Sequence, residues 1–355
     1  MILSSIRMRN KNTTLFTIFS IITLSLICLL VIDNASFAQT PTTTTAKNQS
    51  QFIKSDHIYT TLRKDNSLYD LQKNITIPVG KDMTYVDITA DGKIVAATSS
   101  GDNQTFIFNG TDNKLIGKVK VGEVPKGVKI SPDKNYVFVA NELTGSVSII
   151  SLKDLKVIKE IKVGPVPHNI VFSPDGTKAF VTVQGGDKVV IIDTKTLEKV
   201  GEIEDSKGPH NLDITSDGKL LFVANAGSSN VAVINTTSLQ ILKKIPASLG
   251  HHGVDVSPDD KRVYVSGIGS DKVNVIDVPK LELIKQIVVG KGPHGIRTSA
   301  DGKLLFVDVS SANKIAVIDT NGLEIVKQIP TGNTPFWLAV PGNHWFFSLW
   351  YNLKR

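Results

Sequence analysis

Short segments of alternating apolar and polar residues recur along most of the chain, and turn residues separate them. Residues 212–214 (LDI), for example, precede a Ser-Asp-Gly turn, and residues 220–223 (LLFV) follow it. Segments of four to eight β-forming residues that are bounded by Gly, Pro and Asp predict β-strands. No window of the sequence shows a sustained helical period, so the pattern predicts an all-β protein.

The turns recur with a fixed period of 42 residues. The same position in six successive repeats is occupied by Asp91, Asp133, Asp175, Asp217, Asp259 and Asp301. Pro or Ser before the aspartate presets a tight turn, and Gly after it supplies a positive φ, as in residues 174–176. Each period holds four predicted strands, which is the size of one β-propeller blade.

The two ends of the chain hold the parts of one more blade. Six repeats are complete between about Val86 and Ile329. Residues 336–340 and 345–350 predict strands one and two of a seventh blade, and residues 58–62 and 72–80 predict its strands three and four. A blade built from both termini closes the ring and leaves no open repeat edge. The sequence therefore predicts a seven-bladed propeller of four-stranded blades over residues 52–355, with the aromatic C-terminal residues in the core of the closing blade.

The repeats resemble the YVTN family of β-propeller repeats, which is found in secreted and surface-layer proteins of archaea and bacteria. The resemblance rests on residues 136–141 (YVFVAN), residues 222–225 (FVAN) and the Pro-His-Gly or Pro-His-Asn tripeptides before the turns. The usual Asn of that family is replaced at Val183, Gly267 and Val309. The resemblance implies the fold and an extracytoplasmic setting, but it does not imply one activity.

Residues 1–38 have the parts of a secretory signal peptide. Three cations, Arg7, Arg9 and Lys11, precede apolar residues 15–32, and a small-x-small site ends at Ala38. The apolar segment of 18 residues is also long enough to remain as a membrane anchor. A Thr-rich linker, residues 39–51, follows. We therefore expect a protein that is secreted or anchored at the outer face of the cell membrane.

Composition and charge exclude several classes of protein. Cys28 is the only cysteine and lies in the apolar N-terminal segment, so the folded body has no disulfide, cysteine metal cluster or catalytic thiol. The net charge of +7 falls to +5 when residues 1–38 are removed. Lysines alternate on the predicted outer strands, which indicates edge protection rather than a nucleic-acid surface. We expect a monomer that contacts a membrane only through an uncleaved N-terminal segment.

Four histidines share one position in the 42-residue repeat, seven residues before the turn aspartate: His168, His210, His252 and His294. This position begins the innermost predicted strand, so the side chains ring one mouth of the central channel. Imidazole is a good ligand for copper or zinc, and four rings on consecutive blades could converge on such a metal. Alternatively, a ring nitrogen simply bonds the next blade. The sequence leaves both readings open.

Charged residues lie three positions further along the same strands. Asp87 beside Lys129, and Asp255 beside Arg297, are predicted to form neutralising pairs across neighbouring blades. Asp213 next to Asp255 gives the most acidic segment and is the best place for a divalent cation or a general base.

These observations predict a ligand site at the channel mouth, with Asn141 and Asn225 contributed by the loops after the second strands. The candidate residues are His168, His210, His252, His294, Asp213, Asp255, Asn141 and Asn225. Because no complete catalytic constellation is visible, we expect a binding scaffold for a protein or a small molecule rather than an enzyme. The alternatives are a copper- or zinc-binding protein and a lactonase-like propeller enzyme that uses the channel histidines and aspartates.

Overall fold

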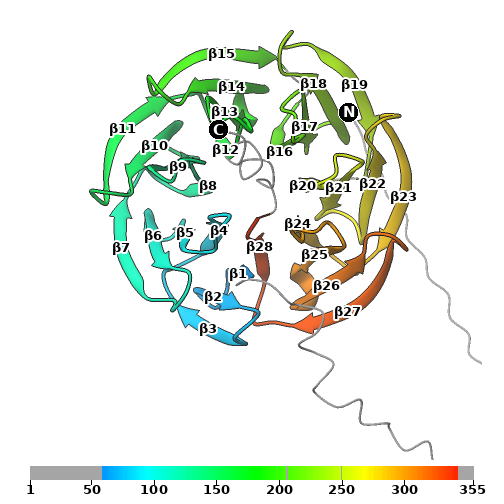
Figure 1. Ribbon diagram of the computed structural model, residues 1–355, viewed down its shortest axis with the longest axis horizontal. Coiled ribbons are helices and arrows are strands. Elements are labelled where there is room, and N and C mark those ends of the chain that lie inside the picture. The colour runs from blue at the N-terminus through cyan, green and yellow to red at the C-terminus, as the bar shows by residue number, and fades with distance from the viewer. Residues whose placement is uncertain (1–57, 205–206, 249, 343–355) are drawn as a thin grey trace, which may run out of the picture. The chain divides into compact units, whose positions relative to one another are not determined.

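A computed structural model describes residues 58–204, 207–248 and 250–342. These residues form seven antiparallel sheets of four strands each around a central channel (Figure 1), which confirms the predicted seven-bladed propeller. We number the blades by their innermost strands, from blade 1 at β4 to blade 7 at β28. Among the described residues, no helix is long and apolar enough to cross a membrane.

The strands of each blade follow the chain from the channel outward, except in blade 7. The innermost strands are β4 (Met83–Ile88), β8 (Pro125–Ile130), β12 (Pro167–Phe172), β16 (Pro209–Ile214), β20 (His251–Val256), β24 (Pro293–Thr298) and β28 (Pro335–Ala339). The second strands are β5 (Ile94–Ser99), β9 (Tyr136–Asn141), β13 (Lys178–Val183), β17 (Leu220–Asn225), β21 (Arg262–Gly267), β25 (Leu304–Val309) and β1 (Tyr59–Leu62).

The outer half of each sheet is equally regular. The third strands are β6 (Gln104–Asn109), β10 (Ser146–Ser151), β14 (Lys188–Asp193), β18 (Asn230–Asn235), β22 (Lys272–Asp277), β26 (Lys314–Asp319) and β2 (Ser67–Asp70). The outermost strands are β7 (Leu115–Lys120), β11 (Lys156–Lys162), β15 (Glu198–Glu204), β19 (Ile241–Pro246), β23 (Glu282–Val288), β27 (Glu324–Pro330) and β3 (Ile75–Pro78). Short 3₁₀ turns, η2 (Gln184–Gly186) and η3 (Ser310–Ala312), follow β13 and β25.

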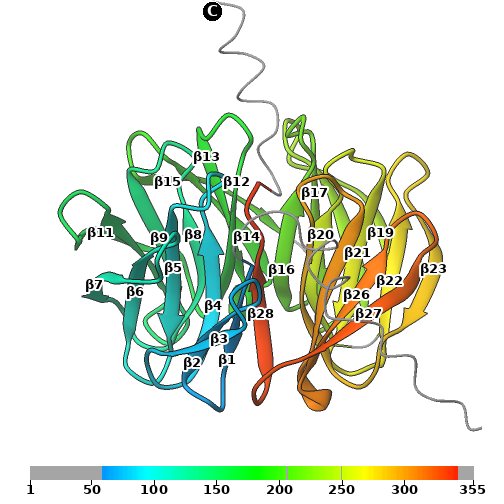
Figure 2. The ribbon, with the colours of Figure 1, turned by 60° about the horizontal axis from the view of Figure 1, so that its bottom comes forward.

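The ring closes in blade 7, where β28 pairs antiparallel with β1 through Tyr59↔Ala339 and Leu62↔Pro335 (Figure 2). The predicted pairing of the two termini is confirmed, but the predicted division of strands is wrong. Residues 58–62 form the second strand rather than the third, residues 67–70 form the third, and only the fourth strand falls within the predicted residues 72–80. Because β1 occupies the second position, residues 345–350 cannot fill it. They lie outside the described residues.

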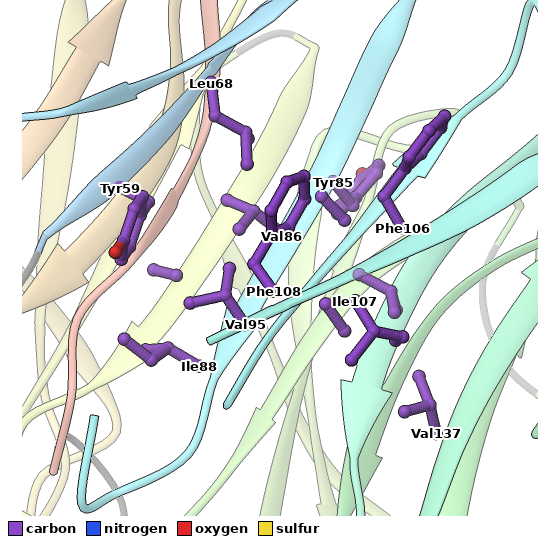
Figure 3. Packing of buried hydrophobic residues seen from close by; sticks show 14 of the residues in the cluster. Tyr59, Leu68, Tyr85, Val86, Ile88, Val95, Phe106, Ile107, Phe108 and Val137 are labelled. Carbon is purple, nitrogen blue, oxygen red and sulfur yellow. The ribbon is translucent and has the colours of Figure 1, made fainter. Parts of the chain in front are cut away.

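The hydrophobic core lies between the blades. Aromatic side chains occupy one position of the second strand in five blades and are at most 1% exposed: Phe138, Phe180, Phe222, Tyr264 and Phe306. Blade 1 carries Ala96 there. Figure 3 shows how its Val86, Val95 and Ile107 pack with Tyr59 of blade 7 and Val137 of blade 2. Each large side chain buried in this way stabilises the fold by roughly 1.5–3 kcal/mol.

The outermost strands protect their free edges with β-bulges. In six blades the register shifts at an equivalent point of the outermost strand, and the extra residue is an aliphatic side chain between 42% and 58% exposed: Ile116, Ile158, Val200, Leu242, Ile284 and Val326. A bulge interrupts the ladder that another chain would need for edge-to-edge pairing. Exposed lysines on the outermost strands, such as Lys156 and Lys162, also oppose edge-to-edge pairing with another chain.

One carboxyl group is buried where blade 6 meets the closing blade. Asp308, on β25, is fully buried and accepts a hydrogen bond from the Thr60 hydroxyl of β1, which is 3.0 Å from both carboxyl oxygens. Burial raises the pKa of Asp308 well above its ordinary value of 3.8, although the bond from Thr60 lowers it. The carboxyl group therefore binds a proton more tightly in the folded chain than in the unfolded chain.

This burial predicts that Asp308→Asn stabilises the protein at neutral pH. Because the folded-state pKa is raised, the Asp308 contribution to stability is fully present at low pH and declines as pH rises above 3.8. The advantage of the Asn variant should therefore be small near pH 3.5 and should grow by about 1.4 kcal/mol per pH unit above it, until the carboxyl ionises in the fold. Urea denaturation at several pH values measures this advantage.

Asp301→Asn is the matched control with the opposite sign. Although burial raises the pKa of Asp301, hydrogen bonds from Ser299 and from the backbone of Lys303 lower it overall. This variant should lose stability above pH 4. An Asp308→Asn variant whose advantage stays constant with pH would contradict the argument.

Candidate functional site

A β-bulge at the start of the innermost strand places the histidines. In blades 1 to 6 the register shifts between the first residues of the innermost strand and the second strand of the same blade. In blade 3 the Thr182 hydroxyl accepts the backbone N–H of Asn169 at this bulge (2.9 Å) and donates to the backbone carbonyl of His210 in blade 4 (2.8 Å). The Thr182 hydroxyl thus gives a partner to the backbone N–H left unpaired at the bulge, and it also joins blade 3 to blade 4.

The same bond recurs around the ring, always to the carbonyl at the repeat position that holds the histidines. We call this group the register carbonyl. Thr61 donates to Thr84 (2.8 Å), Thr98 donates to Lys126 (2.8 Å), and Ser266 donates to His294. Each hydroxyl comes from the second strand of the preceding blade. The register carbonyls are therefore the acceptors that hold neighbouring blades together near the channel.

Three blades lack the hydroxyl, and a histidine replaces it in two of them. The hydroxyl position holds Ala140 in blade 2, Ala224 in blade 4 and Asp308 in blade 6. In blade 4 the ring of His210 hydrogen-bonds the backbone of His252, and in blade 6 the Nδ1 of His294 donates to the carbonyl of Phe336 at 2.6 Å. For these two histidines, the structure agrees with the alternative in which a ring nitrogen bonds the next blade.

The four imidazoles pack against one another in one arc, with successive ring planes tilted by 32° to 57°, and Phe336 continues the arc; we call these five rings the histidine stack. Successive centroids are 3.6 Å apart from His168 to His210, 4.1 Å from His210 to His252, 4.4 Å from His252 to His294 and 3.8 Å from His294 to Phe336. Tyr85 completes the arc edge-on, and its hydroxyl lies 2.8 Å from the Nε2 of His168. Five of these rings are buried: Tyr85, His168, His210, His294 and Phe336.

The stacked arrangement does not fit a copper or zinc ion. Successive imidazoles pack ring against ring, with centroids 3.6 to 4.4 Å apart, and the Nε2 of His168 and the Nδ1 of His294 bond protein groups. Within residues 58–342, where described, no three His, Cys, Asp or Glu side chains are arranged to hold a metal ion. We therefore base no chemistry on a metal at this end of the channel.

Three of the four imidazoles in the histidine stack are neutral at physiological pH. Burial, reinforced by the neighbouring imidazoles, lowers the pKa of His168, His210 and His294 well below 6.5. Glu142 lies close to His168, with its Oε1 3.9 Å from Nδ1, but the nearer partner of Glu142 is Lys126 at 3.5 Å. His168, His210 and His294 are therefore buried, neutral rings that pack on their neighbours in the stack.

The two predicted asparagines are also buried in the fold. Asn141 is fully buried, and its amide donates to the hydroxyls of Ser146 and Ser148 in the next strand of its own blade. Asn225 is equally buried and donates to Asn230 at 3.1 Å. Both asparagines therefore brace the hairpins that end the second strands.

A cavity of about 910 Å³ occupies the opposite end of the channel, where the Asp-containing turns lie. We call it the turn-side cavity. Its apolar wall is formed by Ile88, Ile130, Val171, Phe172, Ile214, Val256, Ala339 and Val340, and three turn prolines, Pro132, Pro174 and Pro258, surround its opening. Sequence reasoning missed this cavity because its wall residues look like ordinary core positions. The available signal was the fixed 42-residue spacing of the turns, because it places all of them at the same end of the channel.

Charged side chains form the floor of the turn-side cavity. Lys129 bonds Asp87 at 2.9 Å, and Arg297 lies 3.5 Å from Asp255, so both predicted pairs form. The guanidinium of Arg297 also lies over the ring of Trp337, 5.0 Å from its centroid. Lys129 and Arg297 both line the cavity and are nearly buried, which gives the floor two cations, each beside a carboxylate.

Two buried carboxylates that do not line the cavity, Asp213 and Asp255, join neighbouring blades. Asp213 accepts the backbone N–H of Val256 at 2.7 Å, and Asp255 accepts that of Thr298 at 2.8 Å. Burial raises the pKa of Asp213 to about 6, although Arg297 and the bond from Val256 lower it. Asp213 and Asp255 therefore use oxygens to hold the next blade, and Asp213 is a carboxyl group that can exchange a proton near neutral pH.

The fold and the channel define this protein as a closed seven-bladed propeller with a histidine stack at one end of its channel and a cavity at the other. The family model described as "Lactonase, 7-bladed beta-propeller" matches residues 54–324, and the chain belongs to that family. This membership supports the propeller fold. The finer YVTN identity stays a prediction.

Comparisons with solved structures concern the fold alone. Hydrazine synthase from Kuenenia stuttgartiensis is 23% identical, with a TM-score of 0.67, over 74% of this chain and 90% of that chain. A functionally unknown protein from Desulfotomaculum acetoxidans DSM 771 is 18% identical, with a TM-score of 0.69, over 81% of this chain and the whole of that chain. No curated protein matches the sequence.

The neutral imidazoles of the histidine stack predict a specific loss of acid stability. A histidine whose folded-state pKa is lowered costs stability as pH falls below 6.5, because the unfolded chain then binds the proton. His168→Phe should remove one such proton while preserving the stack, since Phe336 already occupies this repeat position. Between pH 6 and 5 the stability of the wild type should fall relative to the variant by about 1.4 kcal/mol per pH unit. Urea denaturation measures this difference, and a difference independent of pH would refute a neutral His168.

Proposed function

We propose that this chain is an exported propeller that binds a small organic molecule in the turn-side cavity. The observation that carries the proposal is the cavity itself, with an apolar wall above a charged floor. Its volume of about 910 Å³ lies at the upper end of the usual range for small-molecule sites. The predicted signal segment and Thr-rich linker at residues 1–51 support export.

The paired charges on the floor of the turn-side cavity favour a ligand without strong charge there. Each floor cation lies beside a carboxylate, and at the rim Lys134 bonds Asp91 at 2.7 Å. A strongly charged ligand would have to displace one of these partners and leave it buried without compensation. An uncharged molecule can instead place an apolar face against the wall and polar groups against Lys129 or Arg297.

We test binding by mass spectrometry of small uncharged metabolites retained by the purified protein. Val171→Asp places a carboxylate in the apolar wall, at a strand position where blades 1 and 4 already carry Asp87 and Asp213. This variant should fold and should lose at least about tenfold in affinity for any retained molecule, because the ligand would face an unpaired charge.

Val200→Asp is the matched control. It makes the same change in the same blade, on the outermost strand, where Val200 is 58% exposed. Retention should be unaffected by this variant. If Val171→Asp retains every molecule as well as Val200→Asp does, the cavity is not the binding site.

A second candidate function is hydrolysis of a lactone in the same cavity, which membership of the lactonase propeller family favours. Water would add to the acyl carbon and the ring C–O bond would break, which leaves a carboxylate, a hydroxyl and one released proton. Asp213 does not line the cavity but directly precedes the wall residue Ile214 in β16, so it would accept the proton of the attacking water through a bridging water; its pKa is near 6. Lys129 or Arg297 could stabilise the negative charge that develops on the carbonyl oxygen.

Proton release from neutral lactones, followed by pH-stat titration, tests this candidate. Wild-type activity should rise with pH through about 6 as Asp213 ionises. Asp213→Asn and Val171→Asp should each lower the rate by at least about 100-fold, which is typical for loss of a general base. Activity that persists in Val171→Asp would place the reaction outside this cavity. A wild type without activity would rule out hydrolysis of these lactones and would not affect the proposal of ligand binding.

A further inference from the structure

The chain continues past the edge of the turn-side cavity into an aromatic segment. Residues 343–355 (NHWFFSLWYNLKR) contain five aromatic residues, two leucines and a basic end. We propose that this segment docks into the turn-side cavity of its own chain and competes there with the small ligand. The proposal deepens the proposed function, because it concerns occupancy of the same cavity.

The closing blade leaves no place for the aromatic segment. The 42-residue pattern matches residues 345–350 to the second strand of blade 7, but β1 occupies that position. β1 is paired on one side with β28 and on the other with β2. The segment must therefore bury its aromatic side chains against another surface or leave them in water.

The segment begins at the turn-side cavity. Ala339 ends β28, and Ala339, Val340 and Gly342 all line the cavity. From Gly342 to Ser348 the chain can extend about 20 Å. The aromatic residues therefore start at the opening and can enter it without crossing the outside of a blade.

The chemistry of the segment matches that of the turn-side cavity. Its aromatic and leucine side chains fit the apolar wall, which includes Phe172 and Ile214. Its basic end, Lys354 and Arg355, fits an opening lined by turn carboxylates such as Asp175, which accepts hydrogen bonds within its own turn from Ser173 and Thr177. Apolar contact with opposite charge at the rim is the usual composition of a specific docking site.

Disulfide cross-linking in the full chain tests where the segment lies. The starting chain carries Cys28→Ser, which removes the only cysteine. Ser348→Cys is then paired with Ser216→Cys, which lies at the cavity wall in blade 4, across the ring from blade 7 (Figure 1). The control pairs Ser348→Cys with Ser228→Cys, an exposed position that follows β17, at the opposite end of the same blade.

The Ser216 pair should cross-link within one chain at least about fivefold faster than the Ser228 pair. Equal rates, or cross-linked products of twice the chain mass, would overturn docking within the same chain. The second outcome would assign the segment to a second copy.

Tryptophan quenching by acrylamide separates a docked segment from one that only passes the opening. The chain has three tryptophans, and Trp337 is only 2% exposed, so Trp345 and Trp350 report on the segment. Val171→Asp should expel the segment and raise the quenching constant at least about twofold, whereas Val200→Asp should leave it unchanged. Equal quenching in all three chains would refute docking. Ligand retention by the wild type is measured separately, so this failure would leave the proposed function standing.

Discussion

The hydrogen bond to the register carbonyl is the interaction on which the inner part of the ring depends. A bulge begins each innermost strand, and in six blades the carbonyl exposed there is bonded by a side chain of the preceding blade. A threonine or serine hydroxyl makes four of these bonds, and an imidazole makes the other two. Because neighbouring register residues are thereby drawn together, their rings stack at one end of the channel. The turn-side cavity lies at the other end.

The 42-residue period was sufficient to predict the fold, because a repeat with four strands and a fixed turn has few alternatives. The same period placed His168 and Asp213 at the right levels of the channel but could not show how they are used. A bulge changes which way a side chain faces, and no residue type marks it in advance. The wall of the turn-side cavity was invisible for another reason. Ile88 and Ile130 look the same in a sequence whether they face a neighbouring blade or an empty space.

The division of the closing blade was mispredicted for a related reason. Residues 345–350 are rich in aromatic residues and match a second strand better than residues 59–62 (YTTL) do. Residues 67–70 (SLYD) alternate too briefly to be recognised as a strand. Pairing across the ring decides such cases, since β1 meets β28 through contacts that lie 276 residues apart, as between Thr61 and Trp337. No local pattern contains that information.

The position of β28 also constrains the order of folding during synthesis. β1, β2 and β3 are made first, but their sheet lacks its inner strand until β28 has emerged from the ribosome. Contacts of such large sequence separation form late, and unpaired strand edges are prone to association while they wait. The nascent chain therefore carries an open edge for almost the whole of its synthesis. A chaperone or secretion factor that holds the chain unfolded until the last blade is complete would prevent this edge from pairing with a neighbour.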